Sequence, residues 1–264
     1  MMMMKRIDPI PRNLSADSLL RSLGITAPRD IDLEAIAYYV GLRIKRRCLK
    51  CCEAMITGRG DNGIISVTPG SMIQRERFSI AHEMGHWAHH RGETVACRAA
   101  DIGKFSKTNT VERAADQYAA DLLMPWRMFK AECSGHKRLD LKALKSVAAT
   151  FNTSMTATLI RMVHSGLYGN AMMITHGTGG RKWHRSADGI PGYWFPKADL
   201  DRESFAFELL HNANTQDQNF PRKIGADAWF DNWAAPRHEI TEQSFRVPGE
   251  GVITILLLDN AMLG

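Results

Sequence analysis

Hydrophobic and polar residues near the start of the chain follow first a helical and then a strand-like pattern. Apolar residues recur at helical spacing over residues 14–23 and again over residues 32–40, where Gly41 is placed to end the second helix. Three short apolar runs follow, separated by residues typical of tight turns; the runs are residues 42–46, 54–57 and 63–67. This pattern predicts two short helices followed by a small sheet.

Longer helical patterns occupy the middle of the chain. They predict helices over residues 74–90 and 110–123 around a loop at 92–109, and then a helical pair over residues 141–151 and 155–164. Met124-Pro125 ends the second of these helices because proline disfavours a helical conformation in the residue before it. The turn Asn152-Thr153-Ser154 separates the two helices of the pair.

The last third of the chain mixes strand-like runs, such as residues 252–258, with irregular segments that contain tryptophan. Glycines at 166, 169 and 177–180 indicate a boundary before these segments. Four of the tryptophans are expected to lie in a core rather than in a ligand cage: Trp183, Trp194, Trp229 and Trp233.

These patterns predict an α+β protein in three parts. Residues 1–135 would form a domain with a small sheet and the long helix 74–90. Residues 136–168 would form a helical hairpin, and residues 169–264 a mixed α/β C-terminal domain.

Composition narrows the class of protein. The chain has 264 residues, of which 44% are hydrophobic and 23% charged, as in ordinary globular proteins. No apolar run reaches the roughly 18 residues that a membrane-spanning helix needs, and Met1–Pro11 lacks the pattern of a signal peptide. The five cysteines are an odd number, which together with the missing signal pattern favours reduced thiols and a cytoplasmic location.

Three of the cysteines, Cys48, Cys51 and Cys52, form a C-x-x-C-C cluster. The cluster could be half of a structural metal site, but no second pair at suitable spacing follows it. The favoured interpretation is therefore that these thiols lie in or beside a strand.

The net charge of +6 is partly local, because five basic residues lie close together: Arg43, Lys45, Arg46, Arg47 and Lys50. Such a cluster can attract nucleic acid or an acidic partner protein. It can equally be the solvated edge of a sheet, where basic side chains prevent further strand pairing. The sequence leaves both interpretations open.

The main candidate for chemistry is His82-Glu83-Met84-Gly85-His86, an H-E-x-x-H motif in the long helix. Residues four apart lie on one helix face, so His82 and His86 can hold one Zn²⁺ together. Glu83 can then reach the metal-bound water and act as the general base.

A catalytic zinc needs a third protein ligand, and the candidates are His89, His90, Cys97 and Glu112. His89 and His90 do not match the spacing of the extended metzincin motif, and two histidines with one cysteine is a less usual peptidase set. Glu112 is favoured because it would complete a His₂Glu site. Asp116, one turn later on the same face, could accept a hydrogen bond from a ligand histidine.

Two segments of this chain carry a resemblance to the ImmA/IrrE family of zinc metallo-endopeptidases. They are Arg77-Phe-Ser-Ile-Ala-His-Glu-Met-Gly-His86 and Glu112-x-x-Ala-Asp-x-Tyr-Ala-Ala-x-Leu-Leu-Met-Pro125. The resemblance implies a minimal zincin-like, gluzincin-like metallopeptidase domain that binds one Zn²⁺ through His82, His86 and Glu112, with Glu83 as catalytic base. Asp116 departs from the family, whose members commonly have Asn there.

The resemblance also implies a partner. Some members cleave a repressor that controls a mobile element, and others act in a stress response through a DNA-binding repressor, so the expected substrate is a helix-turn-helix repressor. Tyr118 is a weak candidate for the donor that would stabilise the oxyanion. The C-terminal domain could be sensory or partner-binding, by analogy of architecture only.

Two alternatives stay open. The helical pair at 141–164 could be a helix-turn-helix, but its second helix has a single Arg, whereas a recognition helix needs several polar and basic residues. A packing role is therefore favoured over direct nucleic-acid binding. The alternative function is a non-catalytic regulatory protein that binds a repressor or DNA on a zincin scaffold.

Overall fold

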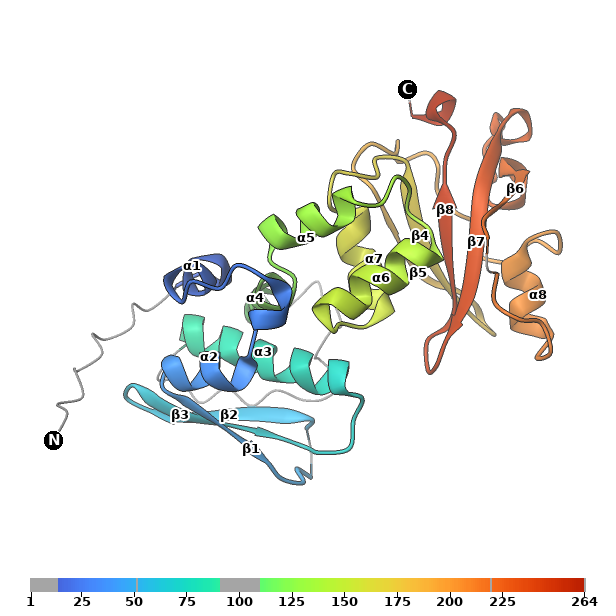
Figure 1. The fold of residues 1–264 in the computed structure, drawn as a ribbon. Helices are drawn as coiled ribbons and strands as arrows, with labels where there is room; N and C mark the ends of the chain where they lie inside the picture. Colours follow the sequence, from blue (N-terminus) through green and yellow to red (C-terminus); the bar gives the residue numbers. More distant parts are fainter. Residues whose placement is uncertain (1–13, 51, 91–109, 219, 264) are drawn as a thin grey trace, which may run out of the picture. The chain divides into compact units, whose positions relative to one another are not determined.

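The computed structural model describes residues 14–50, 52–90, 110–218 and 220–263, and these residues form eight α-helices and two small sheets (Figure 1). The predicted α+β class is confirmed. The chain divides into two compact units: unit 1 spans Met1–Phe129 with Ala149–Ser154, and unit 2 spans Lys130–Ala148 with Met155–Gly264. Within the described ranges, no helix is both long and apolar enough to cross a membrane.

The sheet of unit 1 has three strands in the order β1-β3-β2: β1 (Leu42–Arg46), β2 (Ala54–Arg59) and β3 (Asn62–Val67). β1 pairs with β3 in parallel, and β2 pairs with β3 antiparallel, so that Ile65 lies between Ile44 and Ile56. The three predicted runs are therefore strands, and both β1 and β2 are edge strands of this sheet.

Four helices accompany this sheet in unit 1, and the 3₁₀ turn Pro28–Asp30 lies between the first and the second of them. They are α1 (Ala16–Ser22), α2 (Leu33–Tyr39), α3 (Ile73–His90) and α4 (Thr110–Leu123). The side chain of Asp32 caps α2 by accepting from the backbone N–H of Glu34 at 2.9 Å. α3 contacts β2 and β3 on one side and α4 on another, so the predicted motif helix is the centre of unit 1 (Figure 1).

Trp87 anchors α3 to the sheet. Its indole is buried, and Nε1 donates to the backbone carbonyl of Val40 at 3.0 Å. Two paired glycines leave space for the ring: a Cβ at Gly58 would lie 2.3 Å from Trp87 Cζ3, and a Cβ at Gly63 would lie 3.1 Å from the same atom. The absence of side chains at Gly58 and Gly63 therefore lets α3 approach β2 and β3 closely.

α5 (Trp126–Ser134) was not predicted from the sequence, whereas the next two helices were: α6 (Leu141–Phe151) and α7 (Met155–Val163). Pro125 ends α4 and also begins α5, because its carbonyl accepts from the backbone N–H of Phe129 at 2.8 Å. Between α6 and α7, Asn152 takes a positive φ of 50°.

The sheet of unit 2 is antiparallel throughout, in the order β5-β4-β8-β7-β6. Its strands are β4 (Ala171–Gly177), β5 (Gly180–Ser186), β6 (Arg222–Gly225), β7 (Glu239–Val247) and β8 (Gly251–Leu257). The interpretation of residues 177–180 as a boundary is wrong: Gly177 pairs with Gly180, and the segment is the turn of the β4–β5 hairpin. Gly180 permits this turn with a φ of 97°.

One face of this sheet holds the core of unit 2. Met172 and Ile174 of β4 pack there with buried tryptophans and with α8 (Phe205–His211). Trp194 and Trp229 lie in this core, as predicted, but Trp183 is only half-buried and Trp233 is 77% exposed, so the expectation for Trp233 was wrong. Short 3₁₀ turns complete the unit: Ala226–Ala228, Ala235–Arg237 and Asn260–Met262.

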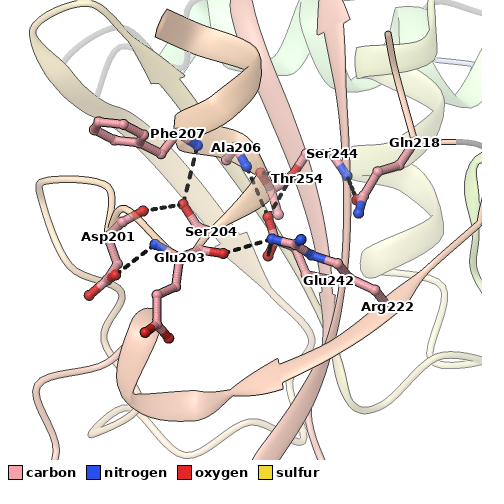
Figure 2. A network of polar contacts seen from close by, with 10 residues as sticks. All are labelled: Asp201, Glu203, Ser204, Ala206, Phe207, Gln218, Arg222, Glu242, Ser244 and Thr254. Carbon is pink, nitrogen blue, oxygen red and sulfur yellow. Dashed lines mark hydrogen bonds and ion pairs between the residues drawn. The ribbon is translucent and has the colours of Figure 1, made fainter. Parts of the chain in front are cut away.

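A buried carboxylate joins α8 to this sheet (Figure 2). Glu242 of β7 is fully buried and accepts from the backbone N–H of Ala206 at 3.0 Å and from Ser244 Oγ at 3.1 Å, while Arg222 Nη2 lies 3.7 Å away. Burial raises the pKa of Glu242, and these donors oppose that effect. Glu242 therefore satisfies a backbone donor in the first turn of α8, which would otherwise lack a partner within the helix.

α7 packs against β4 and β5 of the same unit. Its single basic residue, Arg161, is only 5% exposed, and Leu159 and Met162 of the same helix are buried as well. A guanidinium in this position cannot reach base edges or phosphates, so the packing role expected for this helix agrees with the structure.

Replacing His176 with Leu should make unit 2 less sensitive to acid. His176 is fully buried in β4, and burial, with the charge of Arg181, lowers its pKa to about 4 against a weaker opposing effect of Asp199. Below the ordinary histidine pKa of about 6.5, the unfolded chain therefore binds more protons than the folded chain. The free energy of unfolding then falls as the pH drops from about 6.5 to 4, by on the order of 3 kcal/mol.

Denaturant unfolding followed by tryptophan fluorescence, at pH 7 and near pH 4, measures this difference. The wild type should lose stability over this range, and H176L should lose less. His211, which is exposed on α8, provides the control H211L, which should behave as wild type. An H176L variant with the same pH dependence as wild type would contradict the prediction.

Candidate metal centre

Two histidines on α3 lie next to each other in the interior of unit 1. His82 and His86 are 0% and 1% exposed, and their rings meet edge to face with centroids 4.7 Å apart. Their Nε2 atoms are separated by 3.0 Å, as the four-residue spacing on one helix face predicts.

Glu112 approaches this pair from the first turn of α4. Its Oε2 lies 3.2 Å from His82 Nε2, and its Oε1 lies 3.5 Å from His86 Nε2. Ligand atoms bound at 2.0–2.1 Å around a tetrahedral zinc are roughly 3.3 Å apart, so the three separations fit such an ion. The buried group of His82, His86 and Glu112 could therefore hold a metal.

Asp116, one turn after Glu112, holds the ring of His82 in orientation. Its Oδ1 lies 2.9 Å from His82 Nδ1, which leaves His82 Nε2 directed at Glu112 and His86. Burial alone would lower the pKa of His82, but the hydrogen bond and charge of Asp116, together with the charges of Glu83 and Glu112, raise it above its ordinary value. The carboxylate therefore makes this imidazole more basic and a stronger metal ligand.

Glu83 lies beside the three converging side chains and is fully buried. Burial raises its pKa to about 7, with a further increase from the charge of Glu112, while the charge of His82 and the backbone of Ile56 act in the opposite direction. Neither carboxylate oxygen has a hydrogen-bond partner of ordinary geometry among the described residues. A buried carboxylate without such partners is available to exchange a proton with a bound water.

The other ligand candidates have different positions. His89 is exposed at the end of α3, where its ring packs edge-on against Tyr118. Three of the expected features lie outside the described residues: Cys97, the side chain of His90 and the loop at 92–109. Of His90, only the backbone at the end of α3 is described.

Tyr118, the weak candidate for an oxyanion donor, is buried on α4. Burial raises the pKa of its hydroxyl to about 12, so the group remains protonated and able to donate at neutral pH. Its ring lies beside His89, one turn beyond the imidazole of His86 along α3.

The basic cluster noted in the sequence begins on edge strand β1 of unit 1, and the cysteine cluster lies in the connection from β1 to β2. Cys48 is an exposed free cysteine, Cys52 is half-buried, and Cys51 lies outside the described residues. In the basic cluster, Arg46 contacts Glu34 and Glu76, each at 2.8 Å, and Arg47 donates to Ser66 Oγ at 3.0 Å. Part of this charge is therefore neutralised locally on edge strand β1.

Sequence reasoning did not identify β2 or Trp87 as parts of this site. The backbone of Ile56 in β2 influences Glu83, and Trp87 holds α3 against β2 and β3. A signal was present in the sequence, because Gly58 and Gly63 interrupt two strands, but only the pairing of those strands places both glycines beneath the indole.

Replacing Asp116 with Ala should weaken zinc binding about 10- to 100-fold, because His82 would lose the carboxylate that orients it and increases its basicity. Affinity is measured by competition with a chromophoric chelator. Asp121→Asn is the control, since Asp121 lies on the same helix and accepts a hydrogen bond from Gln117 Nε2. Equal zinc affinity in D116A and wild type would refute this role.

Comparisons with known proteins agree with this architecture. No curated protein matches the chain. A solved structure of a Mycobacterium tuberculosis transcriptional regulator matches with a TM-score of 0.56 at 12% sequence identity, covering 93% of this chain and 86% of that one, which shows a shared fold. The family model for the IrrE N-terminal-like domain, Peptidase_M78, matches residues 49–163, which include α3 and α4. The match identifies residues 49–163 of this chain as similar to an IrrE N-terminal-like domain of the peptidase M78 family.

Proposed function

We propose that this protein is a zinc-dependent endopeptidase that hydrolyses a peptide bond in a regulatory protein. The observation that carries the proposal is the convergence of His82, His86 and Glu112, at separations of 3.0–3.5 Å, beside the buried carboxylate of Glu83. Two imidazoles and one carboxylate are the ligand set of a catalytic zinc that keeps a fourth position open. The M78 domain supports the metallopeptidase class.

Zinc bound by these three side chains would polarise the substrate carbonyl and lower the pKa of a water molecule to about 7. Glu83 would accept the proton of the attacking water and then deliver it to the leaving amine. Its pKa of about 7 suits both transfers near neutral pH. Asp116 would keep His82 in the tautomer that presents Nε2 to the ion.

The substrate would bind as an extended segment along β2. This strand is at an edge of its sheet, and the backbone of Ile56 in its centre influences Glu83. An extended peptide can add to a free sheet edge through main-chain hydrogen bonds. A segment bound in this way would pass directly beside the general base.

The substrate class that we propose is a helix-turn-helix transcriptional repressor, in a stress or mobile-element response. The family resemblance of the motif segments supports this choice, and the similar fold described above is that of a transcriptional regulator. Direct DNA binding by this chain is not part of the proposal, because Arg161 of α7 is buried.

The alternative is a regulatory protein that binds a repressor or DNA without cleaving it. A metal in such a protein would be structural, and Glu83 would have no chemical task. Two measurements separate the proposals: metal content, and the effect of neutralising Glu83.

Purified wild type should contain about one zinc per chain by elemental mass spectrometry, because the three ligands form one site. His82→Ala and Glu112→Ala should each lose most of this zinc. Lys142→Ala, an exposed change on α6, is the control. A wild type that neither contains zinc nor takes it up on titration would exclude the proposed mechanism.

Glu83→Gln should retain zinc and fold while losing peptidase activity by several orders of magnitude, because the amide cannot accept the proton. Mass spectrometry of protein N-termini, in cells producing either wild type or E83Q, would detect cleavage of an unidentified substrate. New N-termini should appear with wild type only. Regulation that persists in cells producing E83Q would support the non-catalytic alternative.

A further inference from the structure

α3 and α4 approach each other most closely at Gly85, the central glycine of the motif. A Cβ built on Gly85 would lie 2.9 Å from the Cα of Ala115, 3.0 Å from the carbonyl oxygen of Ala115 and 3.1 Å from the Cβ of Tyr118. Ordinary contacts of a Cβ atom begin at about 3.4 Å. Two of the three neighbouring atoms belong to the backbone of α4, so they cannot rotate out of the way.

This contact lies in the middle of the metal centre. On α3, Gly85 is between His82 and His86. On α4, Ala115 is between Glu112 and Asp116. Any displacement of α4 at Ala115 would therefore move both carboxylates relative to both imidazoles.

We propose that Gly85 is a positioning residue of the metal centre: its missing side chain sets the separation of α3 and α4 at which Glu112 reaches His82 and His86. The inference rests on the proposed zinc site and adds a residue that contacts neither the metal nor the substrate. Gly85 acts through Glu112, because the two histidines belong to the helix that carries Gly85 itself.

The opposite side of α3 is fixed, so α4 must absorb any added volume. Trp87 fills the space above Gly58 and Gly63 and bonds to the carbonyl of Val40, which prevents α3 from moving toward the sheet. A methyl group on Gly85 would then move α4 by several tenths of an ångström. Metal–ligand distances tolerate only about 0.2 Å, so Glu112 would no longer complete the site.

The intrinsic helix propensities of glycine and alanine predict that Gly85→Ala stabilises α3 itself. Glycine is among the poorest residues in a helix interior and alanine is the best, so Gly85→Ala should not weaken α3 itself. Weaker metal binding in this variant would thus come from the contact with α4.

A double-mutant cycle on the full chain tests the proposal. Zinc affinity is measured by chelator competition for wild type, G85A, E112A and G85A/E112A. G85A should lower affinity at least about tenfold in the wild-type background. In the E112A background, where the displaced ligand is already absent, G85A should lower affinity by a clearly smaller factor, because only the contact of Asp116 with His82 can still be displaced.

The absorption spectrum of bound Co²⁺ gives a second readout, because it reports the geometry of coordination directly. The spectrum of G85A should resemble that of E112A rather than that of wild type. Gly192→Ala is the matched control, since no atom lies within 4 Å of the added Cβ, and it should bind zinc as wild type does.

The outcomes separate this inference from the proposed function. If wild type binds zinc and G85A binds it equally well, the inference alone is overturned. The same holds if G85A lowers zinc affinity by the same factor in the wild-type and E112A backgrounds. Wild type that takes up no zinc would overturn the proposed function, and the inference with it. If circular dichroism shows that G85A is unfolded, Ala115→Ser, which adds one atom on the α4 side of this buried contact, replaces it in the same cycle.

Discussion

The approach of α4 to α3 is the constraint on which the candidate site depends. His82 and His86 are neighbours on one helix, but Glu112 belongs to another helix and reaches them only because the two backbones pack closely at Gly85 and Ala115. Trp87, in the space above two glycines of the sheet, holds α3 from the opposite side. Small residues on both sides of one helix therefore determine the distances within the metal centre.

The buried charge of this site also favours a cation. Three carboxylates, those of Glu83, Glu112 and Asp116, are at most 7% exposed and lie around two histidines. Carboxylates in a poorly solvated interior repel one another and are costly unless positive charge compensates them. Protonation of His82, whose pKa is raised, and of Glu83 would supply part of that compensation. A divalent cation held by His82 Nε2, His86 Nε2 and the Glu112 carboxylate would supply more, and it would take the place of a proton on His82.

The sequence predicted the elements of unit 1 and the position of the motif because these depend on local signals. Residue spacing places two imidazoles on one helix face, and Asp32 and Gly41 mark the ends of α2. The C-terminal sheet was predicted only as a mixed domain, because its order and the role of Glu242 depend on contacts between distant residues. Trp233 was placed wrongly, since composition does not distinguish a buried from an exposed tryptophan. The three-part division by residue number stays a prediction, as do the ligand and base assignments.

Glu83 bears on the choice between an enzyme and a binding protein. A fully buried carboxylate whose oxygens lack hydrogen-bond partners of ordinary geometry lowers the stability of the fold, and a pKa near 7 reflects that cost. A scaffold that only holds a structural metal or a partner gains nothing from such a group, because a neutral or apolar side chain of similar size would pack there more favourably. A general base needs these properties: a position beside the water, a free lone pair and a pKa close to the working pH. The buried carboxylate of Glu83 therefore supports the proposed proton transfer over binding alone.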